Sequence, residues 1–147
     1  MHYTAREFVA AATLEGGVYW LEASGTDVIV SVPAGEPRRW YGLRGPLDGT
    51  ITVAGRGAGD AARVGDGFGS ALRLGRGGGG DAVRWGGGDG DAIRDGDGSG
   101  DAYRDGDGSG DAIRSGAGHG VAVRWGHGIG SAIRRGDGAG SALTEEE

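Results

Sequence analysis

The sequence predicts a mainly β protein: a small N-terminal α+β cap (residues 1–46), then a glycine-rich parallel β-solenoid of ten-residue repeats (residues 47–147). Three observations support this. A Gly-Asp-Ala-aliphatic-Arg phrase returns every ten residues, glycine alternates with other residues in the second half of each copy, and one aliphatic residue occupies the fourth position. Fixed self-similarity of this kind is typical of stacked units whose neighbours cover each other's apolar faces.

The N-terminal segment begins with a helix signal. Thr4 and Glu7 have the spacing of a capping box, in which each side chain bonds the backbone amide of the other residue. Apolar residues follow at helical spacing until Gly16 and Gly17, where we expect the helix to end.

Two strands of a β-hairpin are expected next. Residues 18–23 and 28–32 are rich in β-branched and aromatic residues, and the turn-forming residues 24–27 separate them. All three prolines fall within residues 33–46, which indicates a loop-rich connection to the repeats.

Clear repeats begin at Gly59, and a single residue is inserted before Gly80. The first five residues of a copy predict a short strand, and Gly-x-Gly predicts a turn because glycine adopts positive φ without steric cost. Two copies then make one coil, so alternate copies share a face. The competing arrangement is an antiparallel meander with one strand per copy; the solenoid is favoured because identical units stack in parallel register.

The fourth-position residues are expected to point into the solenoid interior, one from each strand. They are Ala62, Leu72, Val83, Ile93, Tyr103, Ile113, Val123, Ile133 and Leu143. Under this assignment the arginine at the fifth position lies on the surface. There it forms an alternating charge lattice with the aspartates, or alternatively an arginine ladder that grips phosphate or carboxylate groups.

A candidate binding surface lies in the middle repeats. Trp85 and Trp125 occupy the same repeat position four copies apart, so they are expected on one face with Asp105 between them. Aromatic residues are enriched at contact hot spots, and they also serve to cover a thin core; both interpretations stay open. The charged candidates for the same contact are Asp95, Asp97, Asp105, Asp107, Arg94 and Arg104.

The segment Gly96–Arg104 resembles the calcium-binding nonapeptide repeats of RTX proteins, with Asp101 and Tyr103 at the aspartate and apolar positions. That resemblance implies calcium in the turns. The period here is ten, however, and the aspartate is replaced by Ser or Val in other copies, so calcium is an alternative to the expectation of no cofactor.

The whole repeat tract is similar to the glycine-rich decapeptide arrays of actinobacterial phage proteins, in the pattern Gly-Asp-Ala-x-Arg-x-Gly-x-Gly-x. This resemblance implies a phage setting. A looser architectural likeness connects the tract to pentapeptide-repeat solenoids, some of which imitate DNA and inhibit host enzymes.

Composition narrows the function classes. The 147 residues carry a net charge of −6 and no cysteine, so neither nonspecific nucleic-acid binding nor a disulfide framework is expected. No long apolar run predicts a membrane segment, and no catalytic triad, P-loop or dinucleotide fingerprint predicts an enzyme.

The sequence favours a non-enzymatic phage-type binding protein in the host cytoplasm. It would dock on a host or defence macromolecule, with a protein the expected partner, and act as an inhibitor. The alternatives are a virion fibre or decoration protein built as a trimeric β-helix, for which a homo-oligomer is expected, and an RTX-like calcium-binding module.

Overall fold

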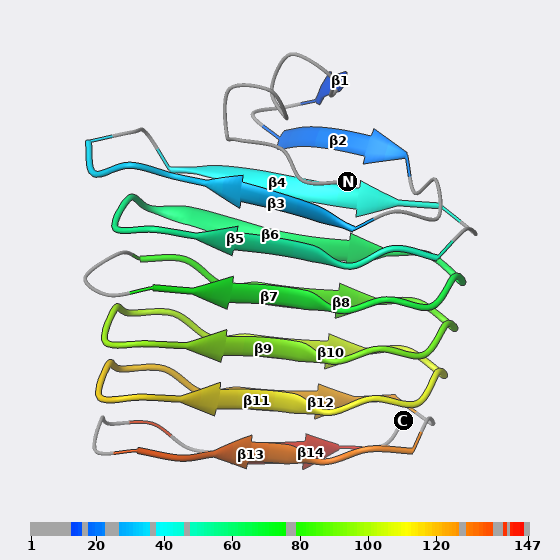
Figure 1. Cartoon of the computed structure of the whole chain (residues 1–147). Helices are drawn as coiled ribbons and strands as arrows, with labels where there is room; N and C mark the ends of the chain where they lie inside the picture. Colours follow the sequence, from blue (N-terminus) through cyan, green and yellow to red (C-terminus); the bar gives the residue numbers. More distant parts are fainter. Residues whose placement is uncertain are drawn as a thin grey trace.

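The protein is a parallel β-solenoid of two facing sheets (Figure 1). The computed structural model describes residues 13–15, 18–22, 27–35, 38–45, 48–75, 79–126, 129–136, 140 and 142–145. The eight-stranded sheet has the order β1-β2-β4-β6-β8-β10-β12-β14, and the six-stranded sheet has the order β13-β11-β9-β7-β5-β3. Apart from the antiparallel pair β1–β2, the paired strands are parallel, which confirms the solenoid and excludes the meander.

The strands are short and evenly spaced. The larger sheet contains β1 (Thr13–Glu15), β2 (Val18–Glu22), β4 (Arg39–Arg44), β6 (Gly59–Val64), β8 (Ala82–Trp85), β10 (Ala102–Asp105), β12 (Ala122–Trp125) and β14 (Ala142–Glu145). The smaller sheet contains β3 (Val28–Ser31), β5 (Ile51–Ala54), β7 (Ala71–Leu74), β9 (Ala92–Asp95), β11 (Ala112–Ser115) and β13 (Ala132–Arg134).

One coil takes two copies of the repeat, as the sequence predicts. Ala102 pairs with Ala82 on one side and Ala122 on the other, so alternate copies share a sheet with a 20-residue period. The inserted residue before Gly80 lies between β7 and β8, and it leaves the register intact because Ala71 still pairs with Ala92.

The N-terminal strands differ from the expected hairpin. β2 and β3 lie in different sheets, and each pairs in parallel with a later strand, β2 with β4 and β3 with β5. β4 occupies part of the proline-containing stretch that we expected to be a loop-rich connection. The helix expected to run up to Gly16 was wrong in its last turn, because Thr13–Glu15 form strand β1, which pairs with β2. Its earlier part lies outside the described residues, so the cap and the domain boundary at residue 46 stay predictions.

The interior holds the opposite face of each repeat strand from the one expected. Alanine at position three and arginine at position five point inward, and the side chains of Ala92 and Arg94 are 0% exposed. The fourth-position Ile93 between them points outward and is only partly buried. A shift of one residue turns every side chain of a strand to the other face. The inward placement of the aliphatic residues was therefore wrong, and so was the surface placement of the arginines.

The buried arginines hold the turns by donating hydrogen bonds to backbone carbonyl groups, an arrangement we call the arginine clamp. Arg104 Nε donates to the Gly90 carbonyl oxygen at 2.8 Å, and its Nη2 donates to that of Gly88 at 2.7 Å. Both acceptors belong to the turn of the preceding coil. Equivalent pairs of bonds are made by Arg73, Arg84, Arg114, Arg124 and Arg134.

This placement is favourable because the interior of a glycine turn is lined with polar backbone groups that water cannot reach. A buried carbonyl without a donor costs about 1–3 kcal/mol, and an aliphatic side chain offers no donor. Guanidinium supplies five donors in a planar fork on a long apolar stem. Burial, reinforced by neighbouring guanidinium groups in the column, lowers the pKa of Arg84 and of Arg94 to about 10. Both arginines therefore remain charged near neutral pH.

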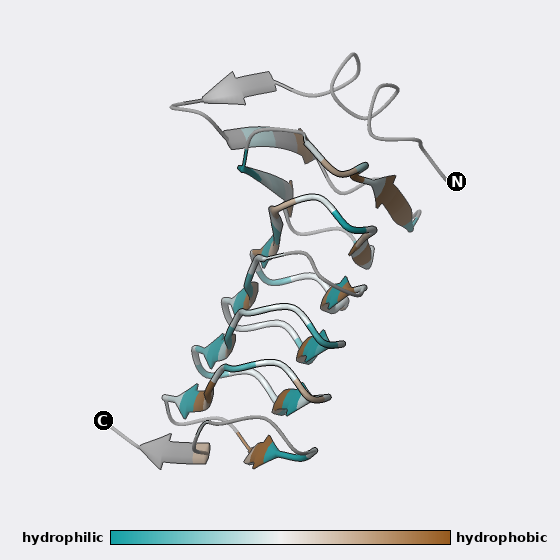
Figure 2. Ribbon diagram, turned by 90° about the vertical axis from the view of Figure 1, so that its left-hand side faces the viewer, coloured by the Kyte–Doolittle hydropathy of each residue, from teal (hydrophilic) through white to brown (hydrophobic). Residues whose placement is uncertain are grey.

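The first coils have an apolar interior instead. Leu43 stands in register with Arg63, and Val53 with Arg73, so aliphatic residues begin the two columns that arginine continues. Val28, Val30, Val32, Tyr41, Leu43, Ile51 and Val53 form one cluster with almost no exposure. Figure 2 shows the two sheets facing each other across this narrow interior along the stack of coils.

Glycine is required where the turns of successive coils touch. Gly100 has φ +155°, and a Cβ atom there would lie 1.8 Å from the Gly80 carbonyl oxygen and 2.8 Å from Arg94 Nε. Neither the backbone nor the clamped guanidinium has room to move.

Gly100→Ala is therefore expected to destabilise the protein by roughly 3 kcal/mol or more, since it adds backbone strain to a steric overlap. Gly79→Ala is the matched control, because its Cβ would meet nothing nearer than the Ser99 carbonyl oxygen at 3.9 Å. Urea unfolding of both variants measures the difference. Equal stability of the two variants would contradict the stacked-turn geometry.

Arg104→Lys is expected to lower the free energy of unfolding by roughly 3 kcal/mol, because lysine has three donors and no planar fork to serve several carbonyls while its buried ammonium still has to be desolvated. Arg135→Lys is the control, since Arg135 is exposed. Thermal or chemical unfolding followed by circular dichroism checks this. If Arg104→Lys unfolds like the wild type, the clamp does not hold the turns.

Candidate protein-binding surface

Aromatic side chains gather on the outward face of the larger sheet. They come from four strands: Trp40 from β4, Trp85 from β8, Tyr103 from β10 and Trp125 from β12. With Val83 they line a groove of about 320 Å³. Parallel in-register pairing places side chains of one sheet face side by side, so the repeat brings together Trp85, Tyr103 and Trp125. Trp40 is added by β4, which precedes the clear repeats.

The rings form two pairs. The centroids of Trp40 and Trp85 are 6.0 Å apart, and those of Tyr103 and Trp125 are 6.2 Å apart. Such separations are favourable for aromatic contacts. Trp40 and Trp85 reach each other across β6, where the fourth-position residue is the small Ala62. Each ring thus packs against another ring of the protein itself.

The same rings cover apolar residues that point away from the interior. Ala62 is 0% exposed, Val83 2% and Val123 7%, although all three lie on the outward face. Trp85 nevertheless keeps 40% of its surface exposed. The Trp125 Nε1 atom is buried and finds no hydrogen-bond partner among the described residues. The aromatic surface therefore both shields the sheet and presents an apolar face to solvent.

An acidic edge borders the groove. Asp105 pairs with Trp85 on one side and with Trp125 on the other, so the expected placement of one carboxylate between the two tryptophans is confirmed. Exposed aspartates continue along the turns that follow β6, β8 and β10: Asp66, Asp89 and Asp107. The groove and this edge together combine large apolar area with negative charge.

The remaining candidate residues do not join this surface. Asp95 ends β9 in the smaller sheet, and Asp97 lies in the turn that follows it, at the opposite edge of the solenoid (Figure 1). Arg94 and Arg104 are 0% exposed, so they cannot present their guanidinium groups to a partner. This corrects their assignment as surface groups, and the reason is the inward register of the repeat strands.

Sequence reasoning missed Trp40, because it treated residues 33–46 as a loop, and Tyr103, because it placed that side chain inside. Tyr103 instead donates its hydroxyl hydrogen to Asp101 Oδ2 at 2.8 Å. Burial, together with this bond, raises the pKa of Tyr103 to about 12. The adjacent aromatic residues Trp40 and Tyr41 were the available signal for a strand.

The second-position aspartates have a structural role that bears on the calcium alternative. Asp101 Oδ1 accepts the Val121 amide at 2.8 Å, and Asp91 Oδ1 accepts the Asp111 amide at 2.8 Å. Ser70 serves Asp91 in the same way. These oxygens thus link one coil to the next. Within the described ranges no group of three or more His, Cys, Asp or Glu residues is arranged to hold a metal ion. Calcium binding stays a prediction.

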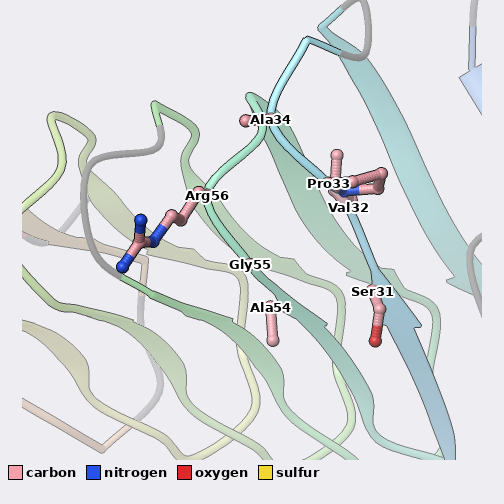
Figure 3. A pocket seen from close by; sticks show the side chains of 7 residues that line it. All are labelled: Ser31, Val32, Pro33, Ala34, Ala54, Gly55 and Arg56. Atoms are coloured by element: carbon pink, nitrogen blue, oxygen red, sulfur yellow. The ribbon is translucent and has the colours of Figure 1, made fainter.

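A second hollow lies at the turns after β3 and β5 (Figure 3). It has a volume of about 550 Å³ and is lined by Ser31, Val32, Pro33, Ala34, Ala54, Gly55 and Arg56. In Figure 3 the Arg56 side chain extends away from the Ser31 hydroxyl group. This lining brings together no pair of groups suited to acid–base or nucleophilic chemistry.

No protein-family model, curated protein or solved structure matches the chain. Among the described residues there is also no helix of sufficient length and apolarity to cross a membrane.

The partly buried Asp81 offers a test of the bonds that link second-position aspartates to the next coil. Asp81 Oδ1 accepts the Asp101 amide at 2.8 Å, and Arg38 Nη2 lies 3.6 Å from its Oδ2. Burial raises the pKa of Asp81, and the carboxylates of Asp60 and Asp101 act in the same direction. Protonation of Asp81 therefore stabilises the folded protein. This contribution is fully present below about pH 3.8 and is lost as the pH rises through the raised pKa of Asp81 in the folded protein.

Asp81→Asn is accordingly expected to be at least as stable as the wild type at pH 7, since the amide oxygen still accepts the Asp101 amide. Asp81→Ala, which leaves that amide without its acceptor, is expected to lose about 1 kcal/mol. Urea unfolding at pH 4 and pH 7 measures both variants. A marked loss of stability in Asp81→Asn at pH 7 would show that the negative charge itself is needed.

Proposed function

We propose that the protein is a non-enzymatic binding protein that docks on a protein partner through the aromatic groove and the acidic edge of the larger sheet. The observation that supports this most directly is the group of four outward aromatic rings from four strands, with Trp85 40% exposed. The residues that carry most of the binding energy at protein interfaces are enriched in tryptophan and tyrosine.

The scaffold suits this role. Each groove residue sits on a strand or at a strand end, and each strand is held by its neighbours in the sheet. Beneath them lie the apolar cluster at β4 and the inward arginines of β8, β10 and β12. A surface of this kind loses little conformational entropy on binding, which favours affinity. The proposed partner is a host or defence protein in the host cytoplasm, as expected for the phage-type repeat arrays that the sequence resembles, and binding would inhibit that partner.

The experiment compares two double variants in capture from host lysate. Trp85→Ala with Asp105→Asn changes the larger sheet, and Ile93→Ala with Asp95→Asn makes equivalent changes on the smaller sheet. Loss of a hot-spot tryptophan costs about 2 kcal/mol, so captured partner is expected to fall about 30-fold for the first variant and to stay unchanged for the second.

Circular dichroism establishes that both variants are folded, and the mass in solution is measured alongside. Equal capture by the two variants would contradict docking through the larger sheet. A stable trimer would favour the fibre alternative instead.

A further inference from the structure

We propose that the groove receives a cationic side chain, arginine or lysine, from a basic segment of the partner protein. This inference rests on the proposed function and specifies the chemistry of the partner at the same site. It is carried by the two ring pairs that line the groove, by the position of Asp105 between Trp85 and Trp125, and by the charge of the neighbouring edge.

The groove has walls that suit a planar or extended cation. The Trp40–Trp85 pair and the Tyr103–Trp125 pair line it together with Val83, which is 2% exposed and forms the floor. Trp85 and Trp125 stand two strands apart in one sheet, a separation of about 10 Å at the usual strand spacing. Asp105 of β10 lies between them, and the groove volume of about 320 Å³ leaves room for one flat group or methylene stem against the rings.

The charge around the groove selects the sign of the ligand. Asp105 lies in register between the two tryptophans, and Asp66, Asp89 and Asp107 are exposed on the adjoining turns. Arg38, two residues before Trp40, is exposed, and its Nη2 lies 2.8 Å from Asp60 Oδ1 and 3.6 Å from Asp81 Oδ2, so carboxylates already oppose its charge. Arg84, Arg104 and Arg124 point into the interior. With a net charge of −6, the chain as a whole attracts cations and repels anions.

Aromatic faces and a carboxylate act together on such a ligand. The face of an indole ring attracts a cation within about 6 Å, and a carboxylate beside the rings adds a charge-assisted hydrogen bond. An anionic ligand gains neither interaction. A neutral sugar could stack on the rings but would gain nothing from the charge of the edge, so its binding would not depend on Asp105.

The test uses the full chain and small probes of defined charge. N-acetyl-arginine amide and N-acetyl-lysine amide are titrated while the indole N–H signals of Trp85 and Trp125 are followed by NMR, with assignments from single Trp variants. N-acetyl-citrulline amide, a neutral isostere of the arginine probe, is the matched control. We expect saturable shifts with both cations and at least tenfold weaker binding of citrulline.

Asp105→Asn is expected to weaken the arginine probe about threefold to tenfold, and Asp95→Asn on the smaller sheet is expected to leave it unchanged. Equal binding of citrulline and arginine would overturn the inference. So would preferential binding of N-acetyl-glutamate amide or of a neutral oligosaccharide, or the lack of saturable shifts with either cation. If the larger-sheet variant loses partner capture while the cations fail to bind, the proposed function stands and only the cationic specificity is wrong.

Discussion

The buried bond between guanidinium and turn carbonyl is the interaction on which the rest of this structure depends. A glycine-rich turn has too little side-chain volume to fill its own interior and leaves its carbonyl groups facing inward. Arginine solves both problems, because its stem fills space beside the small alanine and its fork satisfies carbonyls of the preceding coil. Many such bonds to a charged donor, each worth about 1.5–3 kcal/mol, offset the desolvation of a column of like charges. Without the clamp, strands of four residues with alanine in their core would bury too little apolar surface to remain folded.

The sequence is informative about architecture and misleading about which face is inside. The ten-residue period predicts parallel stacking and the sharing of faces by alternate copies, since both follow from identity between units. The inward face could not be inferred from hydrophobicity, because the interior is polar backbone rather than hydrocarbon. Variation among the copies carried the missing information. Alanine recurs at the third position of the clear copies, whereas the fourth position ranges from Ala62 to Tyr103. A packed interior tolerates small changes in volume only, so the varying position belongs outside.

The candidate surface follows from that same reversal. Once the fourth and sixth positions face outward, their aromatic residues meet along one sheet, and Ala62 leaves the gap across which Trp40 touches Trp85. The pairing of Trp85 with Asp105 and Trp125 was predictable from the period alone. The contribution of Trp40 was not, because it depends on a strand within the proline-containing stretch, where local turn signals conceal the strand. The inward arginines leave aspartate as the main charge on the middle coils, which gives the groove its acidic surroundings.

The clamp also has a direction along the chain. Arg104 reaches back 14 residues to Gly90 and 16 residues to Gly88, so a turn is secured only after the following coil has been laid against it. During synthesis each arginine leaves the ribosome later than the turn that it secures. Assembly would therefore advance from the valine-rich first coils toward the C-terminus, and each new coil would fix the turn of the coil before it. In register with Arg124 the next coil carries Thr144, which has no guanidinium group, so this column of clamps ends there.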